Sequence, residues 1–341
     1  LVGWGWKMER MIGGGSASVF LLSSLLMVFL STIFGHLGLI GPGARWPILL
    51  FLTTGIYFLR IEDVKRLWLR YPGPWLNILL SFIFFLRFFS AFIPQAHGDA
   101  LLYHLMAPRL WNLQEKIALN HDLPIPLLSS TWEYLYLWPQ VLFGGKSAAI
   151  TDLALAQIFS QWIHLIWGLL GALWLLRHFL KSLSLEPLVE FILLCSAMFV
   201  ASLQWTAPLA KNDIGVIFWC LGSWYFLSRR TPFYWLLAGV FAGLAVAGKI
   251  SAILFLIPLA ILTIWKFLWE RFRKNESSPI YGRELYFLTM ALAGAILGAG
   301  PIYLRNWLET GNPFYTMFAH IFPSYWISQS WANHFTAHQP Y

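Results

Sequence analysis

Side chains that can do chemistry are few in this chain, and most of them stand where long apolar runs begin or end. They are Asp99 and His104 in HGDALLYH, Glu133 in TWEYLY, Lys211 and Asp213 in AKND, Lys249 in AGKIS, and Arg305 and Asn306 in YLRNWLETGNPFY. A charge at the centre of a bilayer costs about 2.5 to 3.5 kcal/mol on insertion scales, so an apolar chain keeps charges where water, a partner or a function requires them. These motifs are therefore the first candidates for a functional site.

The residue types in these motifs point to two kinds of chemistry. A carboxylate such as Asp99 can accept a proton as a general base or help to hold a divalent metal such as Mg or Mn, and Glu133 is a second carboxylate that can approach the same site. His104 can hydrogen-bond a phosphate, a sugar hydroxyl or a metal-bound water. Fixed cations such as Lys249 and Arg305 can stabilise a phosphate.

The same residues also have purely structural interpretations. Asp99 can be the N-cap of a helix. Lys249 and Arg305 can snorkel to lipid phosphates, with their stems on apolar surface. Lys211 and Asp213 are close enough in sequence to neutralise one another at the start of a helix.

The composition indicates what kind of element must position these motifs. The chain is 58% apolar, 18% aromatic and 11% charged, with a mean hydropathy of +0.63, unlike an ordinary soluble domain. A helix needs about 20 mostly apolar residues to cross about 30 Å of hydrocarbon. Nine stretches approach this length: 16–35, 46–60, 75–94, 153–177, 187–205, 213–228, 233–248, 251–268 and 285–304. The sequence therefore predicts an all-α, polytopic transmembrane helical bundle, in which the second of these spans is the shortest.

The positive-inside rule orients these spans. One set of alternate connections, which includes 60–74 and 266–283, carries fifteen Lys and Arg residues, whereas the other set carries seven, although it contains 95–150 and 305–341. The first set is therefore predicted to be cytoplasmic, so that the motifs above face outward. This bias toward the anionic inner leaflet accounts for the net charge of +8, and no aromatic-basic pattern indicates nucleic acid.

The spans divide the chain into three parts. Residues 1–74 are predicted to form N-terminal transmembrane helices, 75–310 a transmembrane core with the outer loop 95–150, and 311–341 an outer C-terminal loop; the stop after a loop is typical of a truncated chain. In the outer loop, an amphipathic helix is expected after Asp99, with a kink or split at Pro108. The Trp and Tyr residues of STWEYLYLWPQ fit a belt at the membrane interface. Cys195 and Cys220 both fall inside apolar spans, so no disulfide is expected.

The order of four motifs resembles a known family. GDALLYHLMAPRLW opens the first outer loop, AKNDIGVIFW begins a later helix, GLAVAGKISAILFLIP follows, and PIYLRNWLETGNPFY comes last. This order resembles the bacterial members of the GT-C superfamily, integral-membrane glycosyltransferases related to protein O-mannosyltransferases and lipid A aminoarabinose transferases. The similarity covers the chain from residue 75 to the end. It implies a GT-C-like core, transfer of a sugar from a polyprenyl phosphate carrier to an acceptor outside the cytoplasm, and a location in the bacterial inner (plasma) membrane.

The resemblance also implies a catalytic acid in the first outer loop. That residue maps onto Asp99, with His104 in the same motif and Asp99 as the candidate ligand of an Mg or Mn ion. Many relatives carry an adjacent acidic pair at this place, whereas this chain has Gly98-Asp99-Ala100. GNPFY resembles the loop that closes over the site in the family. The predicted substrate-binding residues are Lys211, Asp213, Lys249, Arg305, Asn306 and Glu133, with Lys249 and Arg305 jointly holding the donor phosphate.

Two other classes stay open. A catalytically silent GT-C-like subunit, acting as a scaffold or lipid-binding component of a larger membrane protein complex, is favoured by the missing acidic neighbour of Asp99. A transporter would be expected to show internal repeats and ionisable residues at the midplane, whereas here the ionisable residues cluster at the outer ends of spans. The sequence has no nucleotide-binding Gly-rich loop, zinc spacing or nucleophile elbow. A transferase of this kind would therefore draw its sugar from a lipid carrier.

Overall fold

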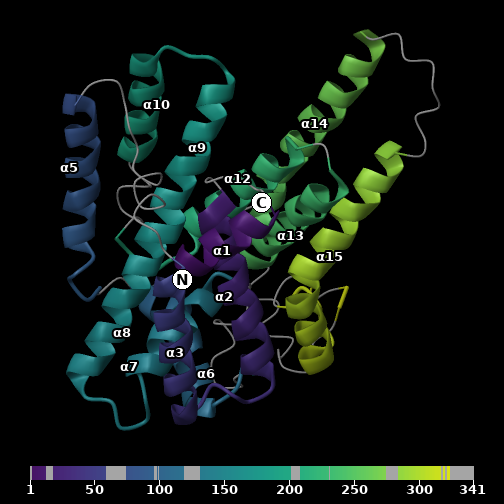
Figure 1. Ribbon diagram of the computed structural model, residues 1–341. Helices are drawn as coiled ribbons and strands as arrows, with labels where there is room; N and C mark the ends of the chain where they lie inside the picture. Colours follow the sequence, from purple (N-terminus) through teal and green to yellow (C-terminus); the bar gives the residue numbers. More distant parts are fainter. Residues whose placement is uncertain are drawn as a thin grey trace.

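The computed structural model describes residues 2–12, 18–58, 74–95, 98, 100–118, 131–200, 208–229, 231–273, 283–315, 318 and 321–322. Every regular element within these ranges is a helix (Figure 1). In chain order the helices are α1 (Val2–Ile12), α2 (Val19–His36), η2 (Pro42–Ala44), α3 (Arg45–Tyr57), α5 (Pro74–Ser90), η3 (Ala100–His104), α6 (Met106–Gln114), α7 (Glu133–Phe143), α8 (Ile150–Ile163), η5 (His164–Leu170), α9 (Gly171–Ser182), α10 (Pro187–Phe199), α12 (Asp213–Leu227), α13 (Pro232–Gly248), η6 (Ile250–Ala252), α14 (Ile253–Arg273) and α15 (Arg283–Thr310). The predicted all-helical class is confirmed for this part of the chain.

The nine apolar stretches all coincide with helices, in the order α2, α3, α5, the run α8–η5–α9, α10, α12, α13, α14 and α15. Three described helical runs are long and apolar enough to cross a membrane: Val19–His36, Ile150–Ser182 and Glu284–Thr310. Five further apolar helices are shorter: Ser81–Ser90, Pro187–Phe199, Asp213–Leu227, Pro232–Gly248 and Ile250–Trp265. The three long helices support a membrane protein, and nine spans stay a prediction.

Successive connections lie at opposite ends of the molecule. In Figure 1 the end of α9, the start of α10, the end of α14 and the start of α15 lie at the top, whereas α6, α7, the start of α8 and the end of α15 lie at the bottom. The bottom end therefore carries the described parts of the segment 95–150, which the sequence assigns to the outer side.

Helices α13 and α15 pack with their backbones in contact. A Cβ atom added to Gly239 of α13 would lie 1.9 Å from the carbonyl oxygen of Ala291 in α15, and Gly243, Gly294 and Gly298 make similar approaches of 2.0 to 2.3 Å. The two glycines on each helix are four residues apart, a spacing of small residues that lets membrane helices approach closely. This interface fixes the C-terminal part of α15 against α13.

The segment after Asp99 is divided into two helical parts. Residues Ala100–His104 form a π-helical turn, and α6 begins at Met106. Pro108 lies in the first turn of α6, where a backbone N–H has no partner within the helix, so its missing N–H disrupts nothing. The kink or split expected at Pro108 is present as a split at Leu105, three residues before the proline. Asp99 and its expected capping role lie outside the described residues.

Helix α15 is longer than the span predicted for residues 285–304. It begins at Arg283 and ends at Thr310, so Arg305 and Asn306 lie in its last two turns rather than in a loop that follows it. Pro301 lies inside α15, which continues through it.

Candidate functional site

His104 and Glu133 form a buried pair between the two described ends of the outer segment. His104 is the last residue of η3, Glu133 is the first residue of α7, and Nδ1 of the histidine contacts Oε1 of the carboxylate. The Glu133 side chain is 4% exposed, and its second oxygen, Oε2, has no hydrogen-bond partner among the described residues. Leaving a buried polar atom without a partner costs about 1 to 3 kcal/mol, and more for a charged group. Glu133 Oε2 is therefore an atom that a proton donor could bind favourably.

Lys249 and Asp213 form a second pair, which a break between two helices creates. Helix α13 ends at Gly248, and Lys249 has an extended backbone (φ −161°) before η6 begins. This break brings the Lys249 ammonium against the carboxylate of Asp213, the first residue of α12. The Lys249 and Asp213 side chains are 46% and 37% exposed, so a ligand can reach them. The ion pair of Asp213 in the structure is thus with Lys249, whereas its sequence neighbour Lys211 was the partner that the sequence suggested.

The Tyr136 hydroxyl joins three parts of the chain beneath these pairs. It donates to the carbonyl oxygen of Lys211 at 2.5 Å and accepts from the indole Nε1 of Trp132 at 2.8 Å. His164 Nδ1 lies 2.9 Å from the same oxygen. Because the one hydroxyl proton is used on Lys211, His164 must donate from Nδ1, which leaves its Nε2 as an acceptor. That Nε2 is buried and has no partner in the described part of the protein.

The two pairs belong to one cluster, because Tyr136, three residues after Glu133 on α7, donates to the carbonyl oxygen of Lys211, two residues before Asp213. Asn212 Nδ2 and Thr131 Oγ1 each donate to a carbonyl oxygen of α13, at 2.9 Å and 2.8 Å. These bonds fix the start of α12 and the approach to α7 against the end of α13. We call the following residues the central cluster: His104, Glu133, Tyr136, Asp213 and Lys249.

Arg305 and Asn306 form a second group at the end of α15. Arg305 donates to the side-chain oxygen of Asn306 from Nη2 at 2.9 Å and from Nε at 3.3 Å, and to the Tyr134 hydroxyl from Nη1 at 3.4 Å. Asn306 Nδ2 donates to the carbonyl oxygen of Pro313 at 3.3 Å, which ties the GNPFY turn to the helix. Gly311 adopts φ +77°, a conformation that favours glycine. We call Arg305, Asn306 and Tyr134 the Arg305 group.

Arg305 is a buried cation without a carboxylate in ion-pair contact among the described residues. It is 4% exposed, and its hydrogen-bond acceptors are a neutral amide and the Tyr134 hydroxyl. Burial raises the pKa of Tyr134, so this hydroxyl stays protonated and neutral. Burying a guanidinium is costly, and an anion that binds it in a bidentate manner would recover much of that cost.

Lys249 and Arg305 belong to different groups, and no contact among the described residues joins the two cations that the sequence assigns to one phosphate. The two groups meet on α7, where consecutive residues, Glu133 and Tyr134, contribute to one group each. A ligand that reaches both cations would therefore have to extend across the start of α7. Asp99, the predicted catalytic residue, lies outside the described residues.

The aromatic residues of STWEYLYLWPQ, predicted to form a belt at the membrane interface, are instead buried in the protein. Trp132, Tyr134 and Tyr136 are 0%, 1% and 0% exposed, and their polar atoms bond within the protein. A Cβ atom added to Gly215 would lie 2.1 Å from the Trp132 ring, so α12 also packs closely on this indole. The sequence did contain a sign of the contact between Trp132 and Tyr136: they are four residues apart, which places them on one face of a helix.

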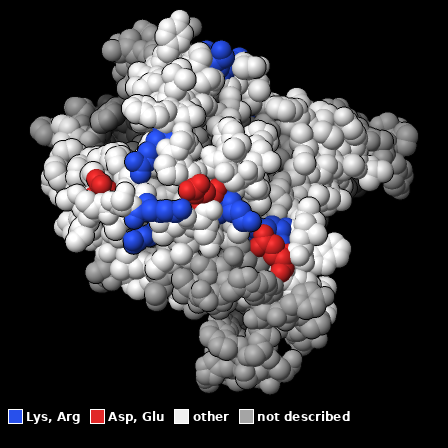
Figure 2. Space-filling model, turned by 90° about the horizontal axis from the view of Figure 1, so that it is seen from below, with Lys and Arg blue, Asp and Glu red and all other residues white. Residues whose placement is uncertain are grey.

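The face at the bottom end of Figure 1 carries few charges, and both signs are mixed. Figure 2 shows that the described Lys and Arg side chains of this face are interspersed with Asp and Glu side chains along one row. An exposed pair at this end of the molecule, Lys146 Nζ and Glu115 Oε1, is 3.4 Å apart. Among the described residues of this face, positive charges are therefore interspersed with negative ones, and anion binding depends on individual cations.

A comparison with protein-family models, one with curated proteins and one with solved structures each found no match to this chain.

Proposed function

We propose that the chain is a glycosyltransferase of the bacterial inner membrane, which transfers a sugar from a polyprenyl phosphate-linked donor to an acceptor outside the cytoplasm. The observation that carries the proposal is the central cluster. Four segments that are distant in sequence meet there, and a buried carboxylate oxygen of Glu133 is left without a partner. The resemblance of the four motifs to the GT-C superfamily supplies the class of reaction.

The reaction needs a base for the acceptor. As the acceptor hydroxyl oxygen attacks the anomeric carbon of the sugar, its proton passes to a carboxylate. Asp99 is the base that the resemblance predicts. Glu133 is a second candidate, because His104 holds Oε1 in place and leaves Oε2 to accept a hydrogen bond from the acceptor.

The reaction also needs a cation for the leaving group. The bond between the anomeric carbon and the phosphate oxygen breaks, and the polyprenyl phosphate leaves with the bonding electron pair. Arg305 is suited to this negative charge, because its guanidinium is buried and preorganised by Asn306. Lys249 is more exposed and already paired with Asp213, so in this proposal it binds the donor at the edge of the site.

The predicted divalent metal has no site built from the described residues. In this part of the chain no group of three or more His, Cys, Asp or Glu residues is placed to hold a metal ion. Glu133 and Asp213 are already paired with His104 and Lys249. The steps above therefore use no metal, and Asp99 as a metal ligand stays a prediction.

A second function has an observation in its favour. The paired state of Glu133 and Asp213 is also what a structural role would produce, and Asp99 lacks an acidic neighbour. The alternative is a catalytically silent GT-C-like subunit, which acts as a scaffold or lipid-binding component of a larger membrane protein complex.

The deciding experiment measures sugar transfer by the purified protein from a polyprenyl phosphate-linked donor, with mass spectrometry of the lipid that co-purifies. Asp99→Asn preserves size and capping ability but removes the base, so transfer should fall by at least about 10²-fold. Asp152→Asn is the matched control, because Asp152 caps the start of α8 by accepting from the backbone N–H of Ala149. Near-normal transfer by Asp99→Asn would assign Asp99 to a capping role. Absence of both transfer and a co-purifying polyprenyl lipid from the wild-type protein would favour the silent subunit.

A further inference from the structure

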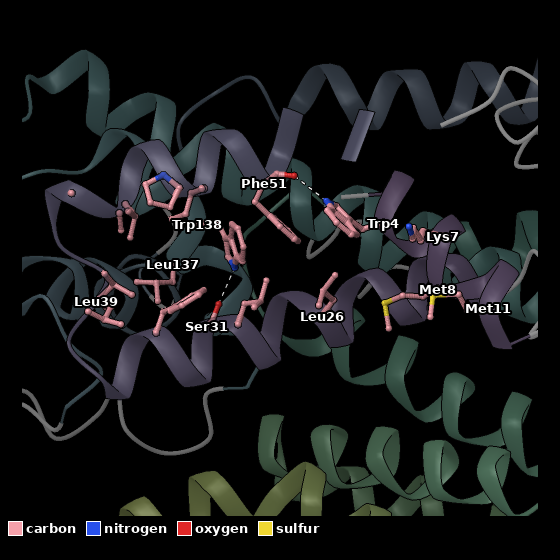
Figure 3. Close-up of a pocket in the computed structure, with 18 residues that line it drawn as sticks. Trp4, Lys7, Met8, Met11, Leu26, Ser31, Leu39, Phe51, Leu137 and Trp138 are labelled. Atoms are coloured by element: carbon pink, nitrogen blue, oxygen red, sulfur yellow. Dashed lines mark hydrogen bonds between the residues drawn. The ribbon is translucent and has the colours of Figure 1, made fainter. Parts of the chain in front are cut away.

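A large apolar cavity lies between α1, α2, α3 and α7, lined by 18 residues (Figure 3). Its volume of about 660 Å³ is within the range of about 300 to 1,000 Å³ that is typical of ligand pockets. The indole N–H groups of its lining are already bonded within the protein: Trp138 donates to Ser31 Oγ at 2.8 Å, and Trp4 donates to the carbonyl oxygen of Phe51 at 2.9 Å. The cavity therefore suits an apolar chain rather than a polar molecule.

The cavity is open on the surface of these apolar helices. Met11, Phe34 and Leu39 line it and are 75%, 43% and 55% exposed, so their outer sides face the surrounding lipid. Along α2 the lining runs from Leu26 to Phe34, which at 1.5 Å per residue is about 12 Å. One leaflet of a bilayer contributes about half of the 30 Å hydrocarbon thickness. The cavity thus matches the depth that one acyl chain of one leaflet reaches.

The cavity has a single charged lining residue, Lys7 of α1. Figure 3 shows Lys7 at one end of the cavity beside Met8 and Met11, with Leu39 near the other end. Its ammonium lies 4.4 Å from the centre of the Phe58 ring, and no described carboxylate is in ion-pair contact with it. An ammonium held over a ring at the end of an apolar cavity is complementary to a ligand with one negative charge and a long hydrocarbon chain.

We propose that this cavity binds an anionic phospholipid, with one acyl chain between the helices and the phosphate at Lys7. The positive-inside rule assigns Lys7 to the cytoplasmic side, whereas Leu39 follows α2 on the side assigned to the outside, so the cavity runs from Lys7 toward the outer end. The site is separate from the central cluster, and it does not depend on the transfer reaction. It is joined to the helices of the cluster through α2, where Ser31 Oγ donates to the carbonyl oxygen of Tyr134 in α7 at 2.9 Å and Ser24 Oγ accepts from Trp219 of α12 at 3.3 Å.

The test uses the full chain, purified, stripped of lipid and reconstituted in nanodiscs of phosphatidylglycerol or of phosphatidylcholine. Native mass spectrometry measures the lipid that stays bound. The wild-type protein should retain phosphatidylglycerol in preference to phosphatidylcholine. Lys7→Gln should reduce this preference by about 10-fold or more, as expected for the loss of a charge-assisted contact. Arg10→Gln is the matched control, because Arg10 lies on the same helix and carries the same charge but donates to the carbonyl oxygen of Phe58 outside the cavity lining.

A second variant tests the chain-binding part of the site. Leu30→Trp fills the cavity and should reduce retention of both lipids, whereas Lys7→Gln should affect the anionic lipid alone. Equal retention of the two lipids by the wild-type protein, or equal effects of Lys7→Gln and Arg10→Gln, would overturn the proposal. Displacement of bound phosphatidylglycerol by an equimolar amount of polyprenyl phosphate would also overturn it, because the cavity would then belong to the donor.

Discussion

The Glu133 carboxylate has one oxygen bound to His104 and one buried oxygen without a hydrogen-bond partner among the described residues, and this asymmetry determines what it can do. A carboxylate with both oxygens satisfied serves structure alone. One free oxygen, held in place by the bond at the other, is the arrangement of a preorganised proton acceptor. The Tyr136 hydroxyl beside it is saturated by three partners, so it has no capacity left for a ligand.

Glu133→Gln separates these roles, because the glutamine oxygen can still bind His104 while the amide cannot take a proton. We expect transfer to fall by about 10²-fold if Glu133 acts as the base, with little change in Tm. Glu115→Gln is the control, since the Glu115 side chain is 44% exposed and its pair with Lys146 contributes little. The two measurements are the initial rate of sugar transfer and the Tm of thermal unfolding, made on the same variants. A loss of Tm that accounts for the whole loss of rate would assign Glu133 to structure.

Substitution of Arg305 tests whether this residue binds the phosphate of the donor. Arg305→Gln should raise the Kd for polyprenyl phosphate by about 10- to 100-fold and leave the affinity for neutral polyprenol almost unchanged, since a charge-assisted contact is worth roughly 1.5 to 3 kcal/mol. Lys249→Gln should weaken phosphate binding as well, because it removes a cation and exposes Asp213. Arg109→Gln, an exposed cation on α6, is the control. Equal losses for the phosphate and the alcohol would mean that Arg305 supports packing instead.

At the scale of elements, the sequence predicted where helices lie better than where they end. The nine apolar stretches became helices because hydrocarbon-length apolar runs have few alternatives. The split before Pro108 was predicted to within three residues, whereas the extension of α15 past Arg305 was missed. The sequence alone does not show that Arg305 finds Tyr134 and Asn306 as partners inside the bundle.

The residues of the candidate site were also predicted better than the contacts between them. The sequence identified Glu133, Asp213, Lys249 and Arg305 as individual candidates. It could not pair Asp213 with Lys249, because that contact depends on how α12 packs against the end of α13. The aromatic residues around these candidates were predicted to form an interfacial belt. Whether a Trp or Tyr is buried depends on how the helices pack together, which the sequence does not show.

The contact of α13 with α15 is the element-scale feature that is most sensitive to mutation. Gly239→Ala places a methyl group where the carbonyl oxygen of Ala291 lies, so the helices must separate, and we expect a loss of about 1 to 3 kcal/mol in the free energy of unfolding. Gly300→Ala is the matched control, because the nearest atom to its Cβ is a methyl carbon of Ile296 at 3.8 Å. Alanine there should be neutral or stabilising by up to about 1 kcal/mol, through helix propensity. Thermal or denaturant unfolding in detergent measures both, and equal effects would contradict the close contact.

The connections between the helices lie at two opposite ends of the molecule, and these ends differ in their number of basic residues. The predicted cytoplasmic connections carry fifteen of the 23 basic residues, and the opposite end carries the described parts of the outer segment and the two groups of the site. The proposed reaction requires this orientation, because a lipid-linked donor and its acceptor meet outside the cytoplasm.

Single-cysteine labelling in intact cells tests this orientation. The two native cysteines, Cys195 and Cys220, are free and can be replaced by alanine. Ser147 precedes α8 and Ser182 ends α9, both are exposed, and the run α8–η5–α9 places them at opposite ends of the molecule. A membrane-impermeant maleimide should label Ser147→Cys in intact cells, and Ser182→Cys only after permeabilisation, because the positive-inside rule puts the connection after α9 in the cytoplasm. The reverse pattern would place the central cluster on the cytoplasmic side, where a donor presented at the outer surface could not reach it.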